Sequence, residues 1–313
     1  MDVPHKYGRC RRVNRRALGV AMVAATALLA GCGSNGSETS AAPAASGAQA
    51  AADGSGLNGL LPAEVRERGY ITVAGDASYP PIASMDTDGK TMVGVDPDMA
   101  AALGEKLGIE LREMNSAFDS IIPGLAGGKF DAAMSWINDT EERRKVVDFI
   151  DYSMDGSSMF VPAGAANRPE TLDDICGLRV ALQKGTVQHT DAEKQSEKCE
   201  QDGKKPVDVQ VFPDQIAANM ALSSGRADLS IADTPVASWQ VQQSNGKFEL
   251  SGVPYGKVYH GMALPKDSGL LQPFAQAFKA IMEDGTYQEI LKKWNLSDAA
   301  IPAPLINGEP LAG

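Results

Sequence analysis

The chain has 313 residues, of which 43% are hydrophobic and 22% are charged, so it is long enough for two domains with ordinary cores. Its formal net charge is −11, although the first 31 residues hold six basic residues and one acidic residue. The other 23 basic and 39 acidic residues give the remainder a net charge of −16. Because such an acidic surface repels phosphate backbones, we expect no nucleic-acid partner. The three histidines (His5, His189 and His260) lie far apart without zinc-type spacing, so we expect neither metal nor cofactor.

The N-terminus has the layout of a secretory signal peptide. Residues 1–16 are strongly basic, and residues 17–30 form an apolar run that is shorter than the roughly 20 residues needed to span a bilayer. The run ends in Leu29-Ala30-Gly31-Cys32, which resembles the bacterial lipobox, whose cysteine is lipidated and becomes the new N-terminus. We therefore expect residues 1–31 to be a lipoprotein signal peptide and Cys32 to carry the lipid. An ordinary signal peptide with a chance cysteine is the alternative.

A tether is expected after the lipidated cysteine. Residues 33–59 consist largely of Gly, Ser and Ala and have too few large apolar side chains to offset the entropy of ordering. Residues 32–59 would thus link the anchor to the globular part. Two fatty chains give stable attachment, which predicts an extracytoplasmic protein that is lipid-anchored to the bacterial cell membrane.

Strands and helices are expected to alternate through the globular part. Strands are predicted at residues 70–74 and 109–114, and helices from residue 96 to 107 and from residue 119 to 127. Pro97 suits the first turn of its helix, and Gly108 is a natural stop. The alternation predicts an α/β domain in layers.

The central stretch, residues 131–149, carries a candidate binding residue. A short apolar run at 132–134 predicts a buried strand, and Thr140-Glu141-Glu142 predicts a helix start. A strand that leads through a polar turn into a helix N-terminus suits a bound carboxylate, and Arg143 lies within reach of that turn. A surface helix with a salt-bridging arginine is the alternative.

An internal echo links this stretch to a later one. Residues 118–132 contain Phe-Asp, a short apolar helix and Gly-Lys-Phe-Asp-Ala, and residues 212–229 contain Phe-Pro-Asp, a helix and Gly-Arg-Ala-Asp-Leu. In each copy the same number of residues separates the glycine from a predicted strand end, which lies at Ser135-Trp136 in the first copy and at Ala232-Asp233 in the second. The echo predicts two similar lobes whose strand ends face a common cleft, although chance similarity of two βα units is the alternative.

The second lobe is expected to carry a disulfide. A predicted strand at residues 178–183 leads through a glycine turn into a helix, and Cys176 and Cys199 bracket this unit. They are the two cysteines left once Cys10 is removed and Cys32 is lipidated. An isolated pair in an exported protein usually forms a disulfide, although two free thiols remain possible.

Nine motifs in order resemble one family, the extracellular solute-binding proteins of amino-acid ABC importers (family 3, polar amino acid type), over residues 64–297. The motifs lie at residues 73–81, 93–100, 118–125, 142–143 with 147–149, 183–186, 225–228, 232–235, 284–287 and 293–294. The resemblance implies an α/β, two-lobe periplasmic-binding-protein fold (type II), with a mixed sheet flanked by helices in each lobe and two hinge crossovers. The expected boundaries are residues 60–155 with 256–300 for lobe 1, 156–255 for lobe 2 and 301–313 for a C-terminal tail.

The resemblance also implies the two main binding residues. It assigns Arg143 of lobe 1 to the α-carboxylate of the ligand and Asp233 of lobe 2 to its α-ammonium, so that a zwitterion bridges the lobes when the cleft closes. A helix cap is the alternative role for Asp233.

Further site residues follow from the same resemblance. The main-chain carbonyl of Ser135 would help to hold the ammonium, and Asn138 and Thr186 would donate toward the carboxylate. The remaining expected contacts are Asp76, Tyr79, Phe118, Trp136 and Gln183. Tyr79 and Phe118 would form apolar walls, and Asp76 would face the distal end of the side chain, which suits a cationic or amide amino acid. Trp136 stands where relatives usually have a small residue, so it could stack on a cation or shrink the pocket.

We therefore expect a monomeric receptor that delivers a free amino acid to an ABC-transporter permease and uses no cofactor. One alternative is an enzyme on the same scaffold, similar to cyclohexadienyl dehydratases, with Asp76 or Glu142 as acid–base. The other is a ligand sensor coupled to a membrane signalling partner.

Overall fold

The computed structural model describes residues 56–311. The expected signal peptide, the lipidation of Cys32 and almost all of the tether lie outside these residues. No helix in the described range has both the length and the apolar character required to cross a membrane.

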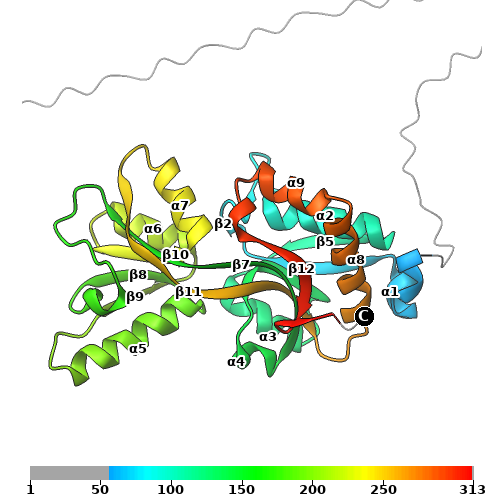
Figure 1. Ribbon diagram of the computed structural model, residues 1–313, viewed down its shortest axis with the longest axis horizontal. Coiled ribbons are helices and arrows are strands. Elements are labelled where there is room, and N and C mark those ends of the chain that lie inside the picture. The colour runs from blue at the N-terminus through cyan, green and yellow to red at the C-terminus, as the bar shows by residue number, and fades with distance from the viewer. Residues whose placement is uncertain (1–55, 312–313) are drawn as a thin grey trace, which may run out of the picture. The chain divides into compact units, whose positions relative to one another are not determined.

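One large mixed sheet organises the described residues (Figure 1), and its central path has the order β5-β1-β6-β11-β7-β10-β8-β9. One half contains β1 (Tyr70–Gly75), β5 (Glu110–Asn115) and β6 (Ala132–Asn138). The other contains β8 (Arg179–Gln183), β9 (Asp208–Phe212) and β10 (Leu229–Asp233). Two long antiparallel strands, β7 (Val147–Pro162) and β11 (Phe248–Pro265), lie in the middle and pass through both halves. They supply the two crossovers that the sequence predicts.

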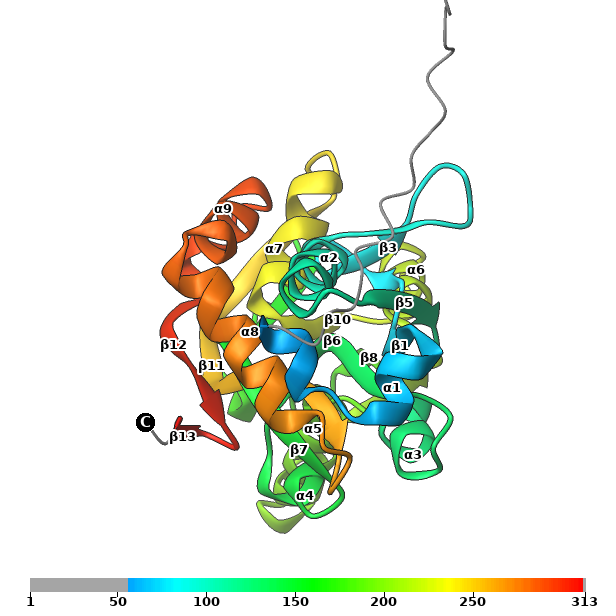
Figure 2. The same ribbon diagram turned by 90° about the vertical axis from the view of Figure 1, so that its right-hand side faces the viewer.

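Helices cover both halves of the sheet. The first half carries α1 (Ala63–Arg68), α2 (Val95–Leu107), α3 (Ile121–Ala126), α4 (Glu141–Arg144), α8 (Leu271–Glu283) and α9 (Thr286–Lys293). The second half carries α5 (Val187–Gln201), α6 (Gln215–Ser223) and α7 (Thr234–Gln243). Helices α2 and α8 pack side by side (Figure 2). The predicted final helical stretch is therefore two helices, because Gly285 takes a left-handed φ of 90° between them.

Short elements complete the fold. Four 3₁₀ turns lie at Gly56–Leu60, Phe118–Ser120, Leu172–Ile175 and Ser297–Ala299, and a small sheet joins β2 (Ser78–Tyr79), β3 (Ala83–Met85) and β4 (Met92–Val93). Side chains alternate across the main sheet in the first half. Ile71, Val73 and Met134 pack in the cluster that contains the α2 core, whereas Ala74 and Ala133 pack with α3.

The internal echo is a structural repeat. In the first half, Asp131 precedes β6 and accepts a hydrogen bond from the main-chain N–H of Thr72 at 2.8 Å. In the second half, Asp228 precedes β10 and accepts one from the main-chain N–H of Arg179 at 2.8 Å. Each aspartate thus ties its own strand to a neighbouring parallel strand, which explains why both copies keep the residue.

The predicted disulfide between Cys176 and Cys199 is present. It joins the end of the Leu172–Ile175 turn to α5, and Cys199 is buried in the core of the second half with Ile175 and Val180. The crosslink therefore fixes α5 against the sheet.

The predicted C-terminal tail begins with a strand. Strand β12 (Ala300–Ile306) pairs with β7, and β13 (Glu309–Pro310) pairs with β12. The hydroxyl of Tyr287 accepts a bond from the N–H of Ile301 and donates one to the carbonyl of Tyr152. Pro302 and Pro304 fall where the pairing register shifts, which is why the segment lacks a regular strand pattern.

Candidate functional site

The ends of strands from both halves meet at the candidate site. The Tyr79 hydroxyl of the first half donates to Asp233 of the second at 2.8 Å, and the Gln183 amide donates to Asp76 at 2.5 Å. The guanidinium of Arg143 donates to the carbonyl of Gly185 at 3.0 Å. These contacts join the two halves and bring Asp76, Tyr79, Arg143, Gln183 and Asp233 to the boundary between them. Arg143 lines the cavity at this boundary, whereas Asp76 and Asp233 are buried behind hydrogen-bond partners and are not among its lining residues.

Asp233 is a buried carboxylate at the junction of β10 and α7. Its side chain makes no capping hydrogen bond to α7, so the alternative role as a side-chain cap is not observed. Instead, Oδ2 accepts from Tyr79, and Oδ1 accepts from Gln188 at 2.7 Å and from Asn138 at 3.5 Å. Burial alone would raise the pKa of Asp233, but His260 and these hydrogen bonds hold it below its usual value. The carboxylate is therefore kept ionised.

Arg143 is held on α4 with its charge directed to the cleft. Thr140 caps this short helix by accepting the N–H of Arg143, and the guanidinium donates to the carbonyl of Asn138 at 2.9 Å. Burial lowers the pKa of Arg143 to about 10, so it remains protonated at neutral pH. Within residues 56–311, no carboxylate lies at ion-pair distance from this guanidinium; the neighbouring Arg144 forms the salt bridge, with Asp139 at 2.6 Å. The salt-bridging arginine at the start of this helix is therefore Arg144 and not Arg143.

A cavity of about 570 Å³ adjoins Arg143. Its other lining residues include Thr140, Glu142, Thr186 and Asp191, so it opens between α4 and the N-terminus of α5. The volume lies within the range of small-molecule sites. The ring of Phe118 lies on another side of Arg143, with its centroid 5.4 Å from the guanidinium carbon.

The remaining predicted polar residues bond to one another. The Ser135 hydroxyl accepts the N–H of Asp76, and burial raises the pKa of Asp76 despite its bonds to Ser78 and Gln183. Thr186 caps α5 and donates to the carbonyl of Gln183 at 2.9 Å. The predicted roles of these residues toward a ligand stay predictions.

Trp136 is part of the core at the inner end of the site. Only 1% of the residue is exposed, and its φ of 48° is one that non-glycine residues rarely adopt. Its N–H donates to Asp96 at 3.0 Å, and its indole Nε1 donates to Asp155 at 2.7 Å. The indole also stacks on His260 with centroids 5.4 Å apart. Both polar groups of Trp136 are therefore engaged by the protein.

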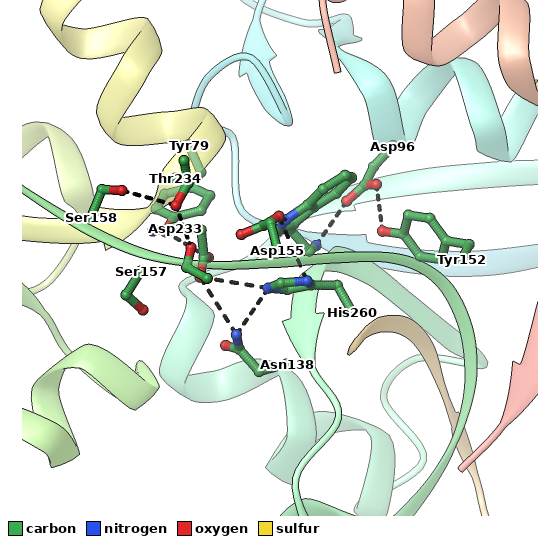
Figure 3. A network of polar contacts seen from close by, with 12 residues as sticks. Tyr79, Asp96, Asn138, Tyr152, Asp155, Ser157, Ser158, Asp233, Thr234 and His260 are labelled. Carbon is green, nitrogen blue, oxygen red and sulfur yellow. Dashed lines mark hydrogen bonds and ion pairs between the residues drawn. The ribbon is translucent and has the colours of Figure 1, made fainter. Parts of the chain in front are cut away.

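Sequence reasoning missed Gln188, Asp155 and His260. Gln188 donates to Asp233, and Asp155 accepts from the indole of Trp136. Figure 3 shows His260 beside Asp233 and Asp155. His260 lies between two carboxylates, with Nε2 3.6 Å from Asp233 and Nδ1 3.7 Å from Asp155. His260, Asp233 and Asp155 come from β11, β10 and β7, and Gln188 comes from α5, so their spacing along the chain gives no motif.

Asp155, Asp233 and His260 are close enough to surround a small ion, since one ligand atom from each lies within 4.8 Å of the others. However, Asp233 already accepts from Tyr79 and Gln188, and Asp155 accepts from Trp136. We therefore assign the group as a buried ion-pair network and not as metal ligands.

Known proteins resemble this chain in sequence and in fold. The profile of the bacterial extracellular solute-binding proteins, family 3, matches residues 71–297. The arginine-binding protein ArgT of Corynebacterium glutamicum is 33% identical over 258 residues, which cover 82% of this chain and 84% of that protein.

Solved structures of related proteins show the same fold. An ancestral arginine-binding protein bound to arginine has a TM-score of 0.66 and 33% identity, covering 72% of this chain and 98% of the other. An ancestral arginine-binding protein bound to glutamine has a TM-score of 0.65 and 32% identity, covering 73% and 99%. These matches confirm the predicted two-lobe type II fold. The chain belongs to the bacterial extracellular solute-binding proteins of family 3.

Proposed function

We propose that this protein is an extracytoplasmic receptor that binds free arginine and delivers it to an ABC-transporter permease. One observation carries the proposal: a cation, Arg143, and an ionised carboxylate, Asp233, come from opposite halves of the sheet and both bond Asn138. A free amino acid carries the complementary pair of charges on neighbouring groups. Similarity to arginine-binding proteins supports the choice of ligand.

Arg143 would bind the α-carboxylate with two N–H groups, and Asp233 would bind the α-ammonium. Since the two residues lie on different lobes, a bound zwitterion favours the closed arrangement. The lobes would comprise residues 60–155 with 256–300 and residues 156–255. A ligand that binds the closed state more tightly than the open state shifts the protein toward closure.

The side chain of the ligand would extend toward Asp76 and Gln183. A guanidinium suits a buried carboxylate because it can form two parallel hydrogen bonds. Asp76 is 4% exposed and faces the Gln183 amide, so the pair offers both an acceptor and an amide. Glutamine is the natural second ligand to test, since a related structure contains it.

The proposal also includes a membrane anchor and a partner protein. The signal sequence and lipobox at residues 1–32 support attachment through Cys32, and family membership supports a permease as partner of a monomeric receptor. Catalysis is not favoured, because the relatives above are binding proteins and Glu142 forms an exposed pair with Lys145.

A ligand panel tests the proposal on a chain that starts at Gly56, since the described residues form their own core within one compact unit. Calorimetry should show that L-arginine binds at micromolar concentration or tighter. Agmatine, which lacks the α-carboxylate, should bind far more weakly because nothing then engages Arg143. Silence across the common amino acids, amines and dipeptides would overturn the function. Strong binding of agmatine would overturn the role of Arg143.

A further inference from the structure

The imidazole of His260 is wholly buried between two carboxylates. Its side chain is 0% exposed, whereas those of Asp155 and Asp233 are 10% and 5% exposed. Within residues 56–311, His260 Nδ1 and Asp155 Oδ1 have no hydrogen-bond partner. A buried carboxylate is costly unless a positive charge or hydrogen bonds compensate it. The arrangement therefore needs a cation, and the imidazole is placed to provide one.

The groups around His260 determine its charge. Asp155 faces it from β7, Asp233 from the end of β10, and the amide nitrogen of Asn138 from β6 at 2.9 Å from Nε2. An amide nitrogen donates to a neutral Nε2, whereas the amide turned by 180° presents its oxygen to the protonated Nε2 of an imidazolium. Arg143 on α4 is a nearby cation, which opposes a positive charge on His260 and lowers its pKa. Burial alone would lower the pKa of His260, but Asp155 and Asp233 outweigh burial and Arg143 and raise it above its usual value.

Asp155 and Asp233 are both acidic, so each carboxylate opposes ionisation of the other unless a cation lies between them. The pKa of Asp155 is raised to about 6 by burial and by Asp233, although His260 opposes the rise. An ammonium that arrives at Asp233 therefore enters a site that already contains a titratable cation. Although two carboxylates flank His260, the ammonium and the imidazolium would both lie beside Asp233 and would repel each other there.

We propose that His260 is a positioning residue of the ammonium subsite: it is the counter-ion of Asp233 when no ligand is bound, and it releases a proton when the ligand's ammonium takes its place. The inference rests on the proposed function, since it assumes an ammonium at Asp233. The N–H bond of the imidazolium breaks, the proton passes to solvent, and a neutral imidazole stays beside Asp155.

The sign of the pH dependence follows from linkage. The ammonium lowers the pKa of His260, so the unliganded protein binds more protons than the complex. Affinity for arginine therefore rises with pH between the lower pKa of the complex and the higher pKa of the unliganded protein. Above that range, the titration of His260 no longer changes the affinity.

The first experiment needs no ligand. NMR titration of the imidazole signals in the chain from Gly56 observes His189 and His260, and H189Q assigns them by removing one. His260 should titrate above its usual value, and D155N should lower its pKa by one unit or more. A His260 pKa at or below its usual value, or one unmoved by D155N, would overturn the counter-ion role, even if arginine binding had also failed.

The second experiment measures the coupling. Calorimetry of arginine binding near pH 7, in two buffers of different ionisation enthalpy, should report release of up to one proton per arginine. H260Q should abolish the release and flatten the dependence of affinity on pH, whereas H189Q, at a histidine outside the cleft, should keep both. Absence of proton release from the original chain, or release that survives H260Q, would overturn the proposal. If Zn²⁺ binds His260 and removes its titration at micromolar concentration, the network is a metal site and the proposal is wrong.

Discussion

At the scale of single residues, three consecutive basic side chains have different tasks. Arg143 points into the cleft and bonds main-chain carbonyls of both halves, whereas Arg144 pairs with the buried Asp139. Lys145 is exposed and pairs with Glu142. Of these three cations, Arg143 lines the cavity, and no carboxylate in residues 56–311 lies at ion-pair distance from its guanidinium. The proposed carboxylate binding is therefore tested at this residue.

Replacing Arg143 by alanine should weaken arginine binding by about 2 to 5 kcal/mol, the range for loss of one member of a buried charge pair. R143K should recover part of this loss, since it restores the charge without the planar pair of donors. Isothermal calorimetry measures both changes, with K145A as the matched control for a lost positive charge nearby. Unchanged affinity in R143A would remove the carboxylate role from this residue.

At the scale of elements, α2 begins with a carboxylate in an unusual setting. Asp96 lies in the first turn, where the helix dipole favours an ionised acid. It is 1% exposed and accepts bonds from the Tyr152 hydroxyl at 2.6 Å and from the N–H of Trp136. Burial nevertheless raises the pKa of Asp96 to about 7. Desolvation outweighs the dipole and the hydrogen bonds at this position.

This raised pKa predicts a pH-dependent stability. The folded chain holds the proton of Asp96 more tightly than the unfolded chain, so this residue's contribution to the free energy of unfolding falls as pH rises from about 4 to about 7. D96N removes the titration and keeps two hydrogen-bonding groups. Raising the pH from 4 to 8 should therefore lower the free energy of unfolding of the original chain, relative to that of D96N, by up to about 4 kcal/mol. Urea unfolding at both pH values measures it, and parallel curves would contradict the assignment.

Most elements of this fold could be predicted from the sequence, because their signals are local. Apolar runs located β1 and β8, Pro97 and Gly108 bounded α2, and the repeated glycine-to-aspartate spacing located β6 and β10. The prediction placed Arg143 and Asp233 on opposite lobes, and the structure has them on opposite halves of the sheet, where both bond Asn138. The repeated strand ends at residues 135–136 and 232–233 were therefore the most informative signal in the chain.

The network around His260 could not be predicted, because it depends on strand register. His260 of β11 lies opposite Asn138 of β6 and Ser153 of β7, and the register with β7 shifts directly after it. Such an irregularity decides which side chains meet, and no periodic pattern marks it. Strand β12 was also missed, because it depends on pairing with the distant strand β7. The start of helix α4 at Thr140-Glu141-Glu142 was predicted correctly, because its cap is local.

At the scale of the whole molecule, side-chain contacts join the halves in addition to the two long strands, among them the bonds of Arg143 to Gly185 and of the Gln215 N–H to Ser78. Tyr79 bonds Asp233, Gln183 bonds Asp76, and Lys184 pairs with Asp119 at 2.9 Å. The first two bonds are buried, whereas Lys184 is 61% exposed and its pair contributes little. The hydroxyl of Tyr79 also occupies an oxygen of the carboxylate that would hold the ligand's ammonium.

Removing that hydroxyl should change the balance between open and closed protein. Y79F loses a bond to a charged group, which contributes about 1.5 to 3 kcal/mol, so the unliganded protein should open more often. Small-angle X-ray scattering should then give a larger radius of gyration for unliganded Y79F, and saturating arginine should restore the compact value through Arg143 and Asp233. K184A, which removes only the exposed bridge, should leave the radius unchanged. An equal radius for Y79F and the original chain would show that the Tyr79–Asp233 bond does not hold the two halves together in solution.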